Sequence, residues 1–155
     1  MQPYLAANLA VLEEMYDHLA ELIRPLDEEC LNWAPPIAET NSIAALVVHI
    51  AGSIDNWLGR AVDEPVQRDR DAEFRARHDA EALSAVVEQS RGRIREWFAR
   101  LEAVDPGTVR RVRRLQSDGE TPLTVAWCVE HAVIHAGEHW GQIQLNRQLY
   151  AARGD

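Results

Sequence analysis

Residues 121–150 read TPLTVAWCVEHAVIHAGEHWGQIQLNRQLY, and this stretch decides how the rest of the sequence is interpreted. It contains His131, His135 and His139, half of the six histidines in the chain. A step of four residues rotates an α-helix only about 40° past a full turn, so neighbouring members of this series share a face. Two imidazoles one turn apart on a helix can bind one metal ion. The stretch therefore predicts a long helix that carries a metal site.

A catalytic metal site needs a third protein ligand and an open position. His49, in the segment ALVVHIAGSIDNW, is the natural donor because it also lies in an apolar helical run. The three histidines of residues 121–150 span roughly 12 Å along the helix axis, which is too far for one ion. One of the end members, His131 or His139, must therefore lie outside the coordination shell, and spacing alone does not say which.

The alternative interpretation is a set of structural histidines, either in the core or on a solvated helix face. The apolar residues that flank the series indicate that much of this helix is packed; they are Val125, Val129, Ala132, Val133, Ile143 and Leu149. Several neutral imidazoles in a packed interface need polar partners. A divalent metal ion satisfies them together, so we prefer the metal site.

The fold class follows from four runs with helical periodicity, over residues 3–24, 42–62, 79–103 and 121–150. They predict an all-α protein, a four-helix bundle without strands, with residues 1–155 forming a single domain. In bundles, metal sites lie between facing helices, which suits His49 together with His135 and His139.

Three connections separate the predicted helices. Prolines interrupt residues 25–41, and residues 63–78 are charge-dense and predict a surface loop with a short turn around Phe74. In residues 104–120, the segment VRRVRRL predicts either an anion-binding segment or, as we prefer, a solvated arm or dimer contact. Thr121 is expected to cap the fourth helix, with Pro122 at its first position.

Composition excludes several classes of function. The formal net charge of −9 argues against non-specific nucleic-acid binding. No signal peptide is recognisable, and no apolar run approaches the roughly 18 residues of a membrane span. Cys30 and Cys128 do not form a CxxC pair, so both are expected to be reduced thiols in a cytoplasmic protein.

Two segments together resemble a known family. NSIAALVVHIAGSIDNWL and HAVIHAGEHWGQIQL are similar to the DinB/YfiT-like superfamily of small bacterial four-helix proteins, and the similarity extends over nearly the whole chain. That pattern has one histidine on helix two and an HxxxHxGQI-type motif on helix four. The resemblance implies that His49, His135 and His139 bind a divalent metal, usually zinc or nickel. It leaves His131 as a neighbouring or entrance residue.

The resemblance also implies what the site does. Members of the superfamily often form dimers, and some resemble S-transferases or isomerases that use a low-molecular-weight thiol. Since three imidazoles are neutral, the ion keeps its full charge and can lower the pKa of water or bind a thiolate, and either gives a nucleophile at pH 7. We therefore expect a metal-dependent enzyme that transfers a thiol, or water, to a small-molecule electrophile, and that forms a homodimer without nucleic-acid or membrane partners.

Two other functions stay open at this stage: a non-catalytic, stress-linked bundle that binds a metal or ligand, and a metal-dependent hydrolase. Gln142, Glu138 and His131 are weak candidates for catalytic roles. Gln142 and Glu138 could orient a ligand or the metal's water. Trp140 stands where the family motif commonly has a smaller or basic residue.

Overall fold

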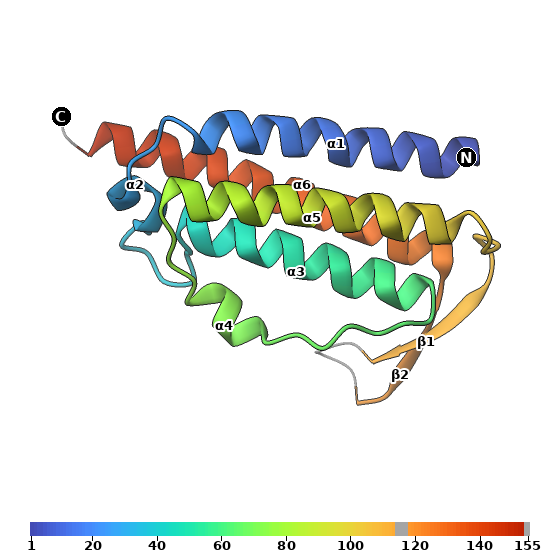
Figure 1. Cartoon of the computed structure of the whole chain (residues 1–155). Coiled ribbons are helices and arrows are strands. Elements are labelled where there is room, and N and C mark those ends of the chain that lie inside the picture. The colour runs from blue at the N-terminus through green and yellow to red at the C-terminus, as the bar shows by residue number, and fades with distance from the viewer. Residues whose placement is uncertain (114–117, 154–155) are drawn as a thin grey trace.

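Four long helices form the body of the molecule, which is a computed structural model that describes residues 1–113 and 118–153. The helices are α1 (Pro3–Ile23), α3 (Ile43–Ala61), α5 (Ala80–Leu101) and α6 (Val125–Ala152). Helices α5 and α6 each pack against both α1 and α3, so the four close into a bundle (Figure 1). The predicted all-α four-helix bundle is confirmed.

Side-chain caps explain where three of these helices begin. The hydroxyl of Ser42 accepts a hydrogen bond from the backbone of Ala45 at the start of α3. Asp79 caps α5 and Thr124 caps α6 in the same way. Such caps satisfy backbone N–H groups that have no partner within the helix. The expected cap at Thr121 is wrong, because Thr124 caps α6, which begins three residues later than that prediction requires.

Helix α6 begins later than predicted because a β-hairpin precedes it, and the sequence interpretation missed this hairpin. Strand β1 (Val109–Arg113) pairs antiparallel with β2 (Glu120–Thr124), so the residues expected to start the helix belong to a strand. Val112 is 1% exposed and anchors β1 on the bundle. Pro122 is tolerated because each strand of a two-stranded sheet has one free edge. The last residues of the segment VRRVRRL, Arg114 and Leu115, lie outside the described residues.

Two short helices complete the fold. Helix α2 (Glu28–Asn32) follows α1, and α4 (Arg70–Phe74) packs against α3 outside the four long helices (Figure 1). Helix α4 occupies the charged segment that was expected to be a loop with a turn near Phe74.

The core is drawn from all four long helices. Its largest fully buried side chains are Tyr16, Phe98, Leu5, Leu12, Leu19, Ile23, Leu31, Ile43, Leu46, Ile50, Ile54 and Leu58. Tyr16 carries the one hydroxyl among these side chains, and it forms a hydrogen bond of 2.7 Å with the hydroxyl of Ser90. Cys30 and Cys128 are both free and buried. This packing fixes α3 against α6, the pair that carries the histidines.

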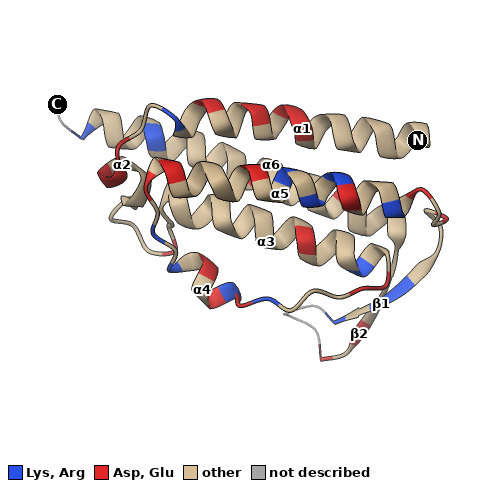
Figure 2. Ribbon diagram, in the orientation of Figure 1, with Lys and Arg blue, Asp and Glu red and all other residues tan. Residues whose placement is uncertain are grey.

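The outer surface of the α1–α5 pair is lined with complementary charge (Figure 2). Arg91 pairs with Asp17 at 2.8 Å, and Arg95 pairs with Glu13 at 2.6 Å. Exposed pairs of this kind contribute little stability each. Among the described helices, we find none both long and apolar enough to cross a membrane.

Candidate metal centre

Helices α3 and α6 bring His49, His135 and His139 together. The two helices run antiparallel along their contact (Figure 1), so the first half of α3 faces the middle and second half of α6. Asn146 of α6 donates a hydrogen bond to the carbonyl of Asn41, just before α3, which fixes this register. One ring nitrogen from each of the three histidines lies within 4.8 Å of those of the other two.

The separations between ring nitrogens suit a small metal ion. Nε2 of His135 lies 3.1 Å from Nε2 of His49 and 3.2 Å from Nε2 of His139. In a tetrahedral site with Zn–N bonds of about 2.0–2.1 Å, two ligand nitrogens lie about 3.3–3.4 Å apart. Three histidines can therefore hold one ion between α3 and α6 with only small adjustments.

The opposite nitrogen of each ring faces an oxygen acceptor. Nδ1 of His49 lies 2.9 Å from Oε2 of Glu73, and Nδ1 of His139 lies 2.8 Å from Oε1 of Gln142. Nδ1 of His135 has a carboxylate oxygen of Glu138 at 3.6 Å. A neutral imidazole that donates from Nδ1 carries a lone pair on Nε2. The lone pairs of His49 and His139 then face Nε2 of His135, whose own Nδ1 is beyond hydrogen-bond distance of Glu138, and a cation among the three Nε2 atoms would be stabilised.

The environment keeps the imidazoles of His49 and His135 neutral. Burial, together with the neighbouring His139 and His49, lowers the pKa of His135 to about 3. The pKa of His49 is also lowered, because burial outweighs the opposing hydrogen bond to Glu73. Both rings are thus unprotonated at pH 7, which is the form that binds a metal ion.

His131 lies beside the cluster rather than within it. Its ring stacks on His135 at 5.7 Å between centroids and on Trp127 at 4.7 Å, with Trp57 edge-on at 4.4 Å. The group of potential ligands found in the described residues does not include it. His131 therefore extends the site as an aromatic wall along α6.

Glu138 and Gln142 occupy the exposed side of the cluster. Both residues are exposed, whereas His49 is only 2% exposed on the opposite side. The side chain of His135 is 25% exposed, and His139 is also partly exposed. The centre is therefore closed on the α3 side and reachable from solvent on the α6 side.

The sequence interpretation missed the residues that α4 contributes. Glu73 is 8% exposed and binds both His49 and Arg68. Phe74 stacks on the His49 ring at 4.3 Å between centroids. The charge-dense segment gave no periodic signal for this. The one available signal was Gly52, since a glycine inside a helix often marks the close approach of another segment.

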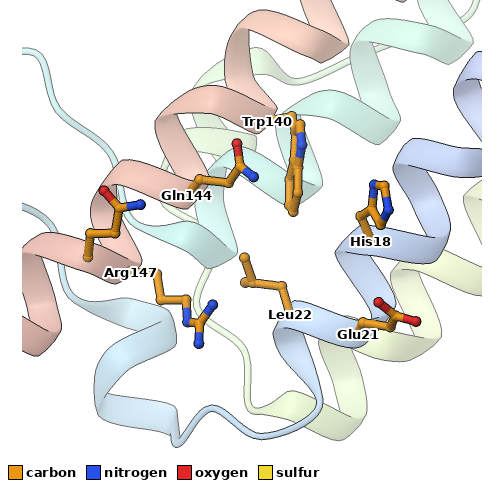
Figure 3. A pocket seen from close by; sticks show the side chains of 7 residues that line it. His18, Glu21, Leu22, Trp140, Gln144 and Arg147 are labelled. Atoms are coloured by element: carbon orange, nitrogen blue, oxygen red, sulfur yellow. The ribbon is translucent and has the colours of Figure 1, made fainter.

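A separate pocket of about 370 Å³ lies between α1 and α6 (Figure 3). His18 and Trp140 stack across it at 6.2 Å, and Glu21, Leu22, Gln144, Arg147 and Gln148 complete its lining. None of the three clustered histidines lines this pocket. Trp140 thus faces α1, although it directly follows His139 in the sequence.

Comparison with known proteins identifies the family. The family model of the DinB superfamily matches residues 11–143, a range that includes all three clustered histidines. The chain belongs to the DinB superfamily. The solved structure of a conserved protein from Enterococcus faecalis is similar to this DinB-superfamily chain, with a TM-score of 0.73 and 15% sequence identity. The match covers 96% of this chain and 97% of the other, and at that identity it shows the fold alone. No curated protein matches the sequence.

Proposed function

We propose that this DinB-superfamily protein is a metal-dependent enzyme that joins a low-molecular-weight thiol to a small electrophile. His49, His135 and His139 would hold the divalent ion, zinc or nickel. The observation that carries the proposal is the convergence of the three Nε2 atoms. On each ring the other nitrogen, Nδ1, has an oxygen nearby, at hydrogen-bond distance for His49 and His139 and at 3.6 Å for His135. Neutral imidazoles suit both metals.

The chemistry of the donor set favours activation of a nucleophile. A divalent ion bound by three neutral histidines keeps its double charge and lowers the pKa of a thiol or water that approaches it. Glu138, on the exposed side, would accept the proton that the thiol gives up. The sulfur then forms a bond to the electrophilic carbon, and the leaving group departs with the electron pair of the broken bond. Gln142 would hold the ring of His139 in place during these steps.

The accessibility of the cluster supports an enzyme over a closed binding module. A structural zinc site has four protein ligands and no open position. Here the described residues supply three histidines, and His135 and His139 are both partly exposed. A small ligand can thus reach the centre from the α6 side.

A direct assay separates the possible functions. The zinc- or nickel-loaded protein is incubated with 1-chloro-2,4-dinitrobenzene, with and without glutathione or cysteine. We expect release of chloride only when thiol is present, and loss of this activity in His135→Ala. Hydrolysis of a p-nitrophenyl ester without thiol would favour the hydrolase. Metal binding without turnover of these or of a wider range of electrophiles would leave a metal-binding module and contradict the enzyme.

We also propose that the protein forms a homodimer through α6. Ile134 and Leu145 are 58% and 52% exposed, and their spacing of eleven residues places them on one face of the helix. Gly137 and Gly141 lie between them on the same face, with open space where a side chain would be. Such a strip of exposed apolar and small residues suits close packing of a second helix.

Leu145→Glu is expected to convert the dimer to a monomer, because it places a carboxylate in a desolvated contact. Light scattering after size-exclusion chromatography measures the change in mass. Gln89→Glu is the matched control, because it adds the same charge at an exposed position of α5, the helix diagonal to α6. A wild-type protein that is monomeric at all concentrations would contradict the proposal.

A further inference from the structure

The ring of His49 is held from α4 by a buried carboxylate. Oε2 of Glu73 lies 2.9 Å from Nδ1 of His49, and the two residues are 8% and 2% exposed. A histidine has two neutral tautomers, and the hydrogen bond at one nitrogen decides which nitrogen carries the lone pair. A carboxylate at Nδ1 favours the tautomer whose lone pair is on Nε2, the atom that faces His135.

Arg68 keeps this carboxylate ionised and fixed. Its guanidinium donates two hydrogen bonds of 2.6 Å, from Nε to Oε1 and from NH2 to Oε2 of Glu73. Two-pronged pairs of this type combine strength with a defined geometry.

Arg68 and Glu73 both lie close enough to Nδ1 of His49 to form a hydrogen bond with it. Its NH2 group lies 3.0 Å from Nδ1 of His49, so without the carboxylate it could donate to that nitrogen instead. The proton would then move to Nε2, and His49 would lose the lone pair that a metal ion needs. With Glu73 present, Oε2 lies within hydrogen-bond distance of both Nδ1 of His49 and NH2 of Arg68, so it can accept a hydrogen bond from each.

Gly52 provides the space that this arrangement needs. A Cβ atom at this position would lie 2.3 Å from Oε1 and 2.9 Å from Cδ of Glu73. A Cβ atom essentially never comes that close to a heavy atom to which it is not bonded. Any side chain at Gly52 must therefore displace the carboxylate of Glu73. Gly52 lies on α3 only three residues after His49. Phe74 stacks on the His49 ring, so α4 holds the imidazole both at its edge and on one face.

We propose that Glu73 is a positioning residue of the metal centre, which fixes His49 in the tautomer whose lone pair is on Nε2. Arg68 holds the carboxylate of Glu73 in place, and the absence of a side chain at Gly52 leaves room for it. This inference rests on the proposed metal site. Partners that hold metal-ligating histidines typically change metal affinity 10–100-fold when they are removed.

Zinc affinity, measured by competition with a chromophoric chelator, tests the proposal. We expect Glu73→Gln to weaken binding about 10-fold and Glu73→Ala about 100-fold. Gly52→Ala should weaken it about 10-fold although Glu73 itself is retained. Asp71→Asn, on an exposed position of the same short helix, is the control and should bind zinc as the wild type does.

A spectroscopic readout separates positioning from a general loss of structure. Long-range ¹H–¹⁵N spectra of the imidazoles report which nitrogen of His49 carries the proton. We expect Nδ1–H in the wild type with and without zinc, and a shift towards Nε2–H in metal-free Glu73→Ala. Unchanged affinity in all three variants, or Nε2–H in the wild type, would overturn the inference. A wild-type protein that binds no zinc would instead overturn the proposed metal site.

Discussion

His135→Ala should lower zinc affinity by at least about 100-fold, because it removes one of the three direct ligands. Its Nε2 atom is the centre of the cluster, at 3.1 Å and 3.2 Å from those of His49 and His139. Loss of a direct ligand exceeds the 10–100-fold effect of losing a residue that only supports one. His49→Ala and His139→Ala should each reduce affinity to a similar extent.

His131→Ala is the matched control for these three variants. It removes an imidazole from the same helix, one turn before His135, but from outside the group of potential ligands. We expect it to retain zinc within about 10-fold of the wild type. Chelator competition measures all four affinities, and circular dichroism confirms that the helices persist. If His131→Ala emptied the site while His139→Ala did not, the ligands would be one helical turn away from those assigned.

Zinc should raise the melting temperature of the wild-type protein by about 5–11 °C. At a free zinc concentration one hundred times the Kd, binding stabilises the folded state by about 2.7 kcal/mol. A domain of this size gains about 2–4 °C per kcal/mol. The physical reason is that the three ligands are brought together only when α3 and α6 pack against each other.

Two variants test whether the thermal shift comes from the proposed metal site. His139→Ala should melt within about 2 °C of the same temperature with zinc and with EDTA, because a site weakened about 100-fold is stabilised by only about 0.4 kcal/mol at this zinc concentration. His18→Ala removes an exposed histidine of α1 that lines the separate pocket, so it should keep the full shift. A shift that survives in His139→Ala would mean that zinc binds elsewhere. The absence of a shift in the wild type would mean that the histidines stabilise the fold without a metal.

The sequence was enough to predict the bundle because the four long helices carry strong periodic patterns. Leu5, Leu12 and Leu19 of α1, which recur at the spacing of one helix face, are all buried. The convergence of His49 with His135 and His139 was also predictable, since two paired histidines on one apolar helix and one on another indicate a shared site. The choice between His131 and His139 needed the family motif.

The parts that could not be predicted depend on contacts between distant segments. The β-hairpin forms because Val112 is buried against the bundle and β1 finds a partner in β2, whereas neither five-residue stretch has a clear strand pattern alone. Glu73 lies in a charged segment that reads as solvated. Its burial depends on Arg68 nearby and on the gap at Gly52.

The most direct test is an anomalous diffraction map of crystals grown with zinc, recorded at the zinc absorption edge. We predict one strong peak per chain between α3 and α6, about 2.0–2.1 Å from Nε2 of His49, His135 and His139, with a fourth position open towards the α6 side. A peak coordinated by His131 in place of His139, or no peak between these helices, would contradict the proposed centre and the function built on it.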